Sequence, residues 1–150
     1  MTQIKISTTI NAPIEIVFNN CRNIDIHQYS ASKTNEKAIA CRISGLINKG
    51  ESVTWKGKNF GIYIQHESII TEMDFPTYFV DEQLKGHFKS FKHQHIFQRK
   101  ENQTITTDIL EYETPFGFIG RLIDIIILKN HLKKFIIYRN SILKELSENH

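Results

Sequence analysis

The chain has 150 residues, of which 40% are hydrophobic and 23% charged, with seven glycines and three prolines. These values are typical of a globular chain that is long enough to bury a core, and they exclude a disordered or fibrous protein. The net charge of +3 comes from lysines scattered along the sequence, so nothing in it predicts a nucleic-acid partner.

The first 30 residues predict one strand and two short helices. The apolar residues of Ile4–Ile10 share one parity, which is the period of a strand. Asn11 and Pro13 then end the strand and open a helix, since asparagine can cap a helix and proline fits its first turn. The expected buried face of this helix is Ile14, Val17, Phe18 and Cys21. A second helix is expected over Ile24–Tyr29, with Asn23 as its cap and His27 facing outward.

From Thr34 onward the hydrophobic pattern has a period of two, and turn-forming residues interrupt it at short intervals. Short turns between consecutive strands predict an antiparallel meander. The predicted strands are Lys37–Ile43, Glu51–Lys56, Phe60–Thr71, Tyr78–Leu84, His87–Lys100 and Thr104–Glu113.

After a Pro/Gly hinge at Thr114–Gly117, the pattern becomes helical and stays so to the end of the chain. The expected apolar stripe consists of Leu122, Ile125, Ile126, Leu132, Phe135, Ile136, Leu143 and Leu146. We expect this stripe to pack on the sheet. An alternative, contact of Phe116–Leu128 with a membrane surface, ranks below packing because Arg121 and Asp124 interrupt the apolar side.

The fold class predicted from this order is α+β, with residues 1–150 forming a single domain. A curved antiparallel sheet of about seven strands would wrap around the long C-terminal helix, with two short helices after the first strand. A strongly twisted sheet and one helix leave space that side chains do not fill. We interpret this space as a ligand cavity.

Nothing in the sequence predicts export or insertion into a membrane. Its first 13 residues lack the apolar core of a secretory signal, and Phe116–Leu128 is too short to span a bilayer. Cys21 and Cys41 lack the spacing of a redox or metal motif, and we interpret both as buried free thiols. We therefore expect a cytoplasmic protein with no integral membrane segment.

The hairpin formed by the last two strands carries the most informative polar residues. A two-residue turn at Glu101 and Asn102 would place His95 opposite Asp108 and His93 opposite Leu110. A carboxylate opposite an imidazole orients the ring and raises its pKa. Three interpretations stay open here: a polar pair that fixes the strand register, a ligand contact, or an acid–base pair. His93 and His95 share a face, as metal ligands do, but no further ligand motif accompanies them, so we expect no metal or cofactor.

Other residues are candidates for the cavity wall. A turn at Lys56–Asn59 would pair Trp55 with Phe60 and place His66 on the same face. Along the strand Tyr78–Leu84, side chains alternate between two faces, and Asp81 lies on a polar one. The favoured interpretation is that this polar face is exposed to solvent. The predicted ligand contacts are Trp55, Tyr63, His66, Phe79, Phe91, His93, His95, Asp108, Tyr112 and Phe116.

Several segments, in this order, resemble the SRPBCC (START-like, helix-grip) superfamily and, within it, the polyketide cyclase/dehydrase-like branch. They are INAPIEIVF at Ile10–Phe18, GESVTW at Gly50–Trp55, FGIYI at Phe60–Ile64, the run Asp74–Phe97, DILEYETPFGFIG at Asp108–Gly120, and YRNSILKEL at Tyr138–Leu146. The resemblance implies the helix-grip fold and, in Arg139, a structural anchor on the sheet or on a carboxylate.

The resemblance also implies a function. It favours a non-catalytic protein that binds or transports a small hydrophobic or amphipathic ligand, such as a lipid, an isoprenoid or a polyketide-like aromatic. The alternative is a cyclase/dehydratase-like enzyme in which His95, held by Asp108, acts as the acid or base. A third interpretation is an interaction module that forms a homodimer.

Overall fold

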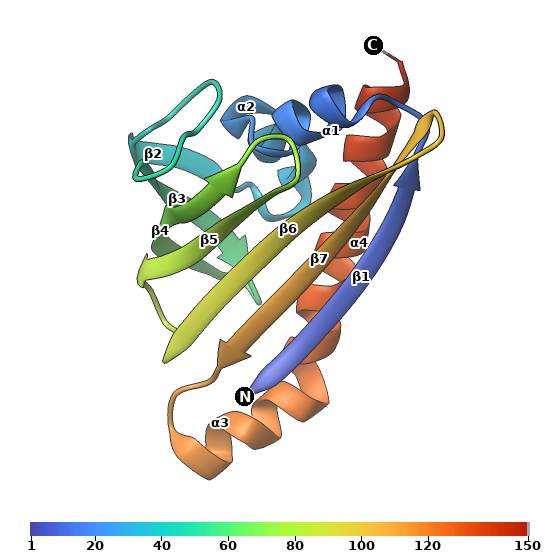
Figure 1. The fold of residues 1–150 in the computed structure, drawn as a ribbon. Helices are drawn as coiled ribbons and strands as arrows, with labels where there is room; N and C mark the ends of the chain where they lie inside the picture. Colours follow the sequence, from blue (N-terminus) through green and yellow to red (C-terminus); the bar gives the residue numbers. More distant parts are fainter. Residues whose placement is uncertain (150) are drawn as a thin grey trace.

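The computed structural model describes residues 1–149 and has the predicted order of elements (Figure 1). They are β1 (Thr2–Ile10), α1 (Ile14–Cys21), α2 (Ile24–Ser30), the 3-10 turn η1 (Ser32–Thr34), β2 (Lys37–Cys41), β3 (Ser52–Asn59), β4 (Ile62–Asp74), β5 (Tyr78–Lys85), β6 (Ser90–Lys100), β7 (Gln103–Glu113), α3 (Gly117–Ile123), the π-helical turn η2 (Asp124–Leu128) and α4 (Lys129–Glu148). Within the described residues, seven antiparallel strands form one sheet in the order β1-β7-β6-β5-β4-β3-β2. The predicted α+β helix-grip architecture is confirmed.

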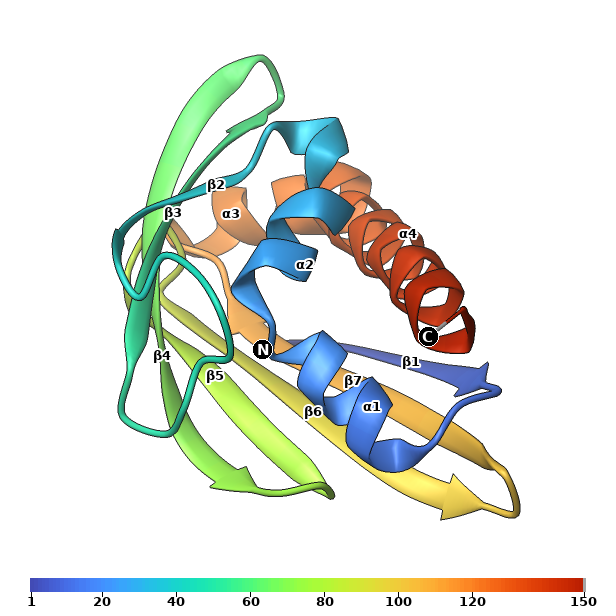
Figure 2. The same ribbon diagram turned by 90° about the horizontal axis from the view of Figure 1, so that it is seen from above.

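The sheet curves around α4, which lies along its concave side, as Figure 2 shows from above. The helices α1 and α2 contact α4 near its C-terminal end, and α3 lies at the opposite end of the molecule (Figure 1). No helix of residues 1–149 combines the length and hydrophobicity needed to cross a membrane. The concave side of the sheet therefore has two ends, one closed by α1 and α2 and the other next to α3.

The end covered by α1 is a packed apolar core. Ile14, Val17 and Phe18 recur at the spacing of one helical face, and all three are buried. The Phe18 ring meets the rings of Phe79 and Phe97 with centroids 5.4 Å and 5.1 Å apart. Side chains therefore fill the space between α1 and the sheet.

Two local predictions are confirmed in detail. The Asn23 side chain caps α2 by accepting hydrogen bonds from the backbone N–H groups of Asp25 and Ile26. In the β6–β7 hairpin, Lys100 pairs with Gln103, so His95 lies opposite Asp108 as expected. The alternation of a strand then places the side chains of His93, His95 and Asp108 on the concave face.

The β3–β4 hairpin differs from the prediction. β3 continues to Asn59, and the turn consists of Phe60 and Gly61, both in left-handed backbone conformation. Trp55 therefore pairs with His66 rather than with Phe60. The Lys-Gly-Lys-Asn sequence resembles a turn, but Gly57 packs against Glu36 inside the strand, where a larger residue would be crowded.

The two thiols also differ from each other. Cys21 is partly buried under the sheet, as its place on the apolar face of α1 predicts, whereas Cys41 is exposed, so the prediction of a buried thiol is wrong there. Cys41 has left-handed backbone at the end of β2, an edge strand, where its side chain leaves the core. Both cysteines are free.

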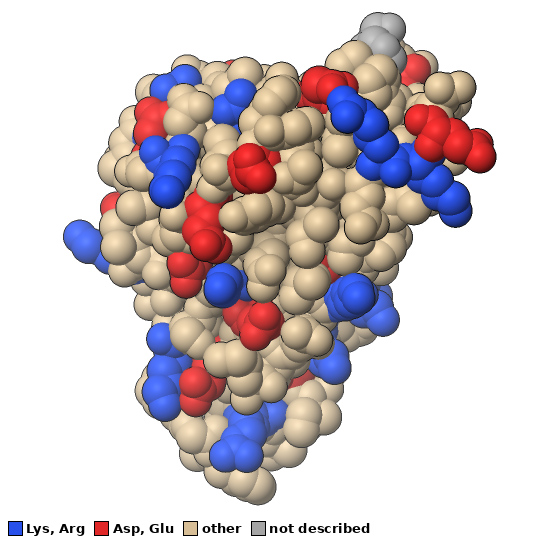
Figure 3. All heavy atoms as spheres, in the orientation of Figure 1, with Lys and Arg blue, Asp and Glu red and all other residues tan. Residues whose placement is uncertain are grey.

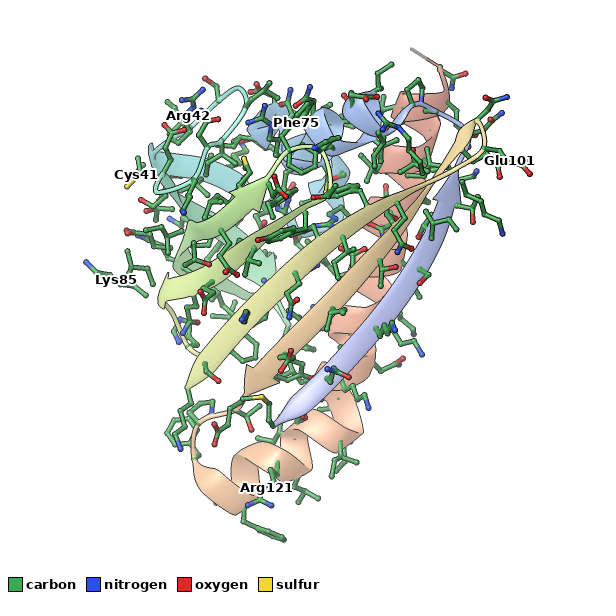
Figure 4. The ribbon with its side chains drawn as sticks, viewed as in Figure 1. Cys41, Arg42, Phe75, Lys85, Glu101 and Arg121 are labelled. Carbon is green, nitrogen blue, oxygen red and sulfur yellow. The ribbon has the colours of Figure 1, made fainter. Side chains whose placement is uncertain are left out.

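The start of the C-terminal helix differs most from the prediction. We define the apolar tip as Phe116–Ile127; it includes α3 and most of η2 and lies at the end of the molecule where Figure 4 labels Arg121. Most of its large apolar side chains face solvent, including those of Leu122, Ile125 and Ile126 from the expected stripe. The reason is Asp124, which is buried and accepts hydrogen bonds from the hydroxyls of Thr2 and Tyr112, both at 2.5 Å.

Candidate functional site

A cavity of about 440 Å³ lies between the concave face of the sheet and α4. This volume is within the roughly 300–1,000 Å³ range of small-molecule sites. Most of its wall is aliphatic and aromatic, contributed by both the sheet and the helix. Representative wall residues are Trp55, Ile64, Ile70, Phe79, Phe91, Leu110, Leu132 and Ile136. The interior expected from the sequence is therefore open rather than solidly packed.

Seven of the ten predicted ligand contacts line this cavity: Trp55, His66, Phe79, Phe91, His93, His95 and Phe116. The other three do not. Tyr63 is 60% exposed and lies near Lys56 and Lys58, because its parity in β4 points it away from the concave face. Asp108 and Tyr112 are buried behind the wall. They contact the residues that support the cavity rather than its open space.

Asp108 is the centre of a buried polar cluster. It accepts hydrogen bonds from His93 Nε2 at 2.8 Å, Arg139 Nη2 at 3.0 Å and Asn140 Nδ2 at 2.6 Å. Arg139 is thus an anchor on a carboxylate, as the resemblance implied, and its side chain also lines the cavity. Together with His95 and Asp81, these four residues are called the Asp108 network below.

His95 connects the two carboxylates of the network. Its Nε2 donates to Asp81 Oδ2 at 2.6 Å, and its Nδ1 lies 3.3 Å from Asp108 Oδ1. The predicted opposition of His95 and Asp108 is correct, but the shorter contact is to Asp81 on the neighbouring strand β5. The interpretation of Asp81 as solvent-facing is wrong: the residue lines the cavity. Alternation along one strand could not reveal this, because Val80 next to it is buried as well.

The charges of the network follow from its contacts. Burial opposes the charge of His95, but Cys21, Asp108 and Asp81 outweigh it and raise the pKa of His95 well above its ordinary value. Burial also works against a charged Asp108, yet Arg139 and the two histidines hold its pKa well below the ordinary value. The hydrogen bond from His95 overcomes burial at Asp81 and lowers the pKa of that carboxyl to about 2. Two carboxylates thus face two cations, His95 and Arg139.

His93 is the neutral member of the network. Burial and the adjacent charge of His95 lower the pKa of His93 to about 4, although Asp108 acts against this shift. The two imidazole rings stack with centroids 3.8 Å apart. This contact would be unfavourable if both rings were positively charged. At neutral pH His93 therefore donates from Nε2 to Asp108, and its Nδ1 remains a hydrogen-bond acceptor.

Asp81 is the member of the network that a ligand can reach. Its side chain keeps 23% of its surface accessible, compared with 3% for His95 and 5% for Asp108. Since Asp81 lines the cavity, this accessible surface faces the open space. A negatively charged hydrogen-bond acceptor, oriented by His95, is therefore presented to whatever occupies the cavity.

A second polar pair lines the cavity, and the sequence did not reveal it. His27 Nε2 lies 2.8 Å from Glu36 Oε1, and the His27 ring packs on Trp55 with centroids 4.4 Å apart. Burial would raise the pKa of Glu36, but the hydrogen bond from His27 lowers it. His27 was expected to face outward because it follows the apolar positions of α2; η1 and β2 fold back over it.

The cavity opens beside the apolar tip. Phe60 and Phe116 line the cavity and are also exposed to solvent, so they lie at its rim. The Phe60 ring packs on His131 of α4, which also contacts Asn59 at 3.1 Å. Gly120 allows this corner to close, because a Cβ there would lie 1.9 Å from the carbonyl oxygen of Pro115.

Within the described residues, one group of side chains could hold a metal ion. Potential ligand atoms of Asp81, His93 and His95 lie within 4.8 Å of one another. In this structure, however, the carboxylate and both histidines are engaged in the hydrogen bonds given above. Among residues 1–149, the buried polar atoms without a partner are Thr71 Oγ1 and Ser90 Oγ, and neither belongs to the network. Each of these three side chains is therefore already engaged within the protein.

Neither a family model nor a curated protein matches the chain. Solved structures with a similar fold do. The protein TTHA0849 from Thermus thermophilus has a TM-score of 0.78 at 14% identity, with 96% of this chain and 95% of that chain covered. A START superfamily protein from Mycobacterium smegmatis has a TM-score of 0.73 at 11% identity, covering 98% and 97%. Ginseng major latex-like protein 151 from Panax ginseng has a TM-score of 0.66 at 14% identity, covering 97% of both chains.

Proposed function

We propose that this chain, which has the START-like helix-grip fold, binds a small hydrophobic or amphipathic ligand in its internal cavity. The observation that carries the proposal is a cavity of about 440 Å³ with an apolar wall and a polar cluster on one side. Burial of apolar ligand surface would contribute roughly 25 cal/mol per Å². We also propose that the protein is cytoplasmic and that it carries a lipid, an isoprenoid or an aromatic ligand.

The polar end of the ligand would meet Asp81. Its carboxylate is accessible from the cavity and its charge is fixed by His95, so it selects a hydroxyl or amine over an apolar group. The rest of the wall is mainly apolar, as over Trp55, Ile70 and Phe91, and the His27–Glu36 pair forms a second polar region on it. An amphipathic ligand with a hydrogen-bond donor at the end that meets Asp81 fits this distribution.

A catalytic role for His95 and Asp108, as in a cyclase or dehydratase, has less support. A general acid works best when its pKa lies near the operating pH. The pKa of His95 is raised well above that range, and both of its ring nitrogens face carboxylates. Binding without chemistry is the function that this geometry favours.

A blocked cavity tests the proposal. Ser68 lines the cavity, and Ser68→Phe would fill part of it, whereas Ser7 is exposed on β1, so Ser7→Phe is a matched control. An uncharged phenylnaphthylamine dye should bind the native protein and the control, with at least a tenfold loss of affinity in Ser68→Phe. Native mass spectrometry of protein purified from cells should show a bound small molecule. Equal dye binding by all three proteins, with no bound molecule, would refute the proposal.

A further inference from the structure

The apolar tip exposes a continuous hydrophobic surface. Eight of its twelve residues are large apolar side chains that face solvent: Phe116, Phe118, Ile119, Leu122, Ile123, Ile125, Ile126 and Ile127. Phe116 is 83% exposed and Ile125 75% exposed. Soluble proteins seldom leave a large contiguous apolar patch uncovered unless it is an interaction site. The tip therefore needs a partner that offers an apolar environment.

The exposed charged residues in and just after the tip have one sign. Over residues 114–134 the sequence contains four basic residues, Arg121, Lys129, Lys133 and Lys134, all of them exposed. The single acidic residue in this range, Asp124, is buried and bonded to Thr2 and Tyr112. Figure 3 shows blue and red side chains on the lower part of the molecule, with blue ones at its lowest end, where the tip lies. The partner must accept both apolar side chains and a positive rim.

Anionic phospholipid bilayers have both properties. An amphipathic helix can place its apolar face about 5–10 Å into the headgroup region while lysines and arginines contact anionic headgroups. Lys134 lies five residues after Lys129 on α4, or roughly 8 Å along the helix axis, so the whole basic set is within reach of the headgroups. In Figure 4, the Arg121 side chain extends outward from α3, away from the sheet.

A second copy of this chain fits the surface less well. Closed dimers bury the same patch on both subunits. The tip would then bring Arg121 and the α4 lysines of one copy towards those of the other, with no exposed carboxylate in residues 114–134 to pair with them. Like charges across an interface are unfavourable. We propose that the apolar tip docks the protein onto membranes that contain anionic phospholipids.

Docking in this way would place the cavity opening at the membrane. Phe116 and Ile123 are exposed on the tip and also line the cavity. A ligand could therefore pass between bilayer and cavity without crossing water. This last consequence rests on the ligand-binding function proposed above, whereas docking itself does not.

The test is flotation of the full chain with vesicles. Native protein should float with vesicles of phosphatidylcholine and phosphatidylglycerol in equal amounts, and weakly with phosphatidylcholine alone. Raising the salt from about 0.1 M to about 1 M should release it, because the Debye length falls from about 10 Å to about 3 Å. The double variant Phe118→Gln/Ile125→Gln should partition at least tenfold less. Lys129→Gln should lower partition about fivefold on the anionic vesicles alone.

A matched control is available at the other end of the molecule. Ile39 and Ile43 are also exposed apolar residues, and they flank Cys41 and Arg42, which Figure 4 places far from Arg121. Ile39→Gln/Ile43→Gln should float like the native protein. So should the blocked-cavity variant Ser68→Phe, which separates docking from ligand binding.

Three results would overturn the inference. The first is native protein that stays in solution with both kinds of vesicle. The second is an equal loss of flotation in the tip variant and in the Ile39/Ile43 control. The third is a dimer, measured by light scattering, that Phe118→Gln/Ile125→Gln dissociates, which would assign the surface to a second copy of the chain.

Discussion

The Asp108 network and the apolar tip depart in opposite directions from the usual distribution of residues in a globular protein. The network holds two carboxylates and a guanidinium in and behind the cavity wall, while the tip holds eight large apolar side chains in solvent. Strand β7 links the two regions, since it carries Asp108 and also Tyr112, which donates a hydrogen bond to Asp124 of the tip. A buried charge and an exposed aliphatic surface each reduce the stability of a folded protein, unless a partner compensates for them.

This comparison separates residues that stabilise from residues that interact. In the network, every charged group has its partner within the protein, so removing one partner should cost folding free energy. On the tip, the most exposed apolar groups, such as Phe118 and Ile125, lie mostly in solvent, so changing them should leave folding nearly unaltered and alter association. The predictions below test this difference, beginning with the largest expected effect.

Removal of the Arg139 guanidinium should destabilise the protein most. Arg139→Met leaves Asp108 buried without its fixed cation, a change that typically costs about 3–5 kcal/mol. Arg121→Met removes an exposed arginine from the tip and should change the free energy of unfolding by less than about 0.5 kcal/mol. Urea unfolding of both variants measures the difference. The double variant Arg139→Met/Asp108→Asn should recover part of the lost free energy of unfolding, because it no longer buries an unpaired charge. Equal losses in Arg139→Met and Arg121→Met would contradict the distinction between network and tip.

Acid should destabilise the protein through His93. The pKa of His93 is lowered to about 4 in the folded state, whereas an unfolded histidine titrates near 6.5. Between these values the unfolded chain binds a proton that the folded protein does not, so the free energy of unfolding falls as the pH falls, by on the order of 3 kcal/mol. His66, whose pKa is also lowered by burial, acts in the same direction.

The other network residues do not interfere in this window. His95 has a raised pKa, so its contribution is fully present below about 6.5 and is lost at higher pH. Asp81 and Asp108 have lowered pKa values and lose their contribution only below about 4. Urea unfolding between about pH 7 and pH 4 should therefore show a slope that is smaller in His93→Gln. An unchanged slope would mean that folding does not lower the pKa of His93.

Tyr112 links the network strand to the tip and should have an intermediate effect. Tyr112→Phe removes one of the two hydroxyls that bind the buried Asp124 and should cost about 1–3 kcal/mol. Tyr63→Phe, at a residue that is 60% exposed, is the control and should be neutral within about 0.5 kcal/mol. Thermal unfolding compares the two variants. A neutral Tyr112→Phe would show that this bond does not hold the tip in place.

The sequence predicted the parts of this structure that depend on local patterns. Alternation and turn chemistry were sufficient for the β6–β7 register, and Asn23 was sufficient for the start of α2. Contacts between distant elements could not be predicted in this way. The pairing of His95 with Asp81 depends on how β5 lies beside β6, and that of His27 with Glu36 on how the chain folds back after α2.

The tip was mispredicted for a physical reason. Its hydrophobic residues continue the apolar stripe of α4, and periodicity alone predicts that a continuous stripe packs on one surface. The π-helical turn Asp124–Leu128 changes the register of the helix, and the bonds of Asp124 to Thr2 and Tyr112 turn the carboxylate inward. The isoleucines that follow Asp124 then face solvent. A single buried hydrogen-bonded group thus determines which side of the helix is exposed.

The smallest expected effect is the most direct test of the tip. Ile125 is 75% exposed, so Ile125→Ala should change the free energy of unfolding by less than about 0.5 kcal/mol. Ile136 lies on the same C-terminal helical segment and is 4% exposed, so Ile136→Ala should cost about 2–5 kcal/mol. Urea unfolding of both variants in the absence of vesicles measures the contrast. If Ile125→Ala lowered the free energy of unfolding by more than about 1 kcal/mol, this side chain would be packed against the protein in solution. It would then not belong to an exposed docking surface.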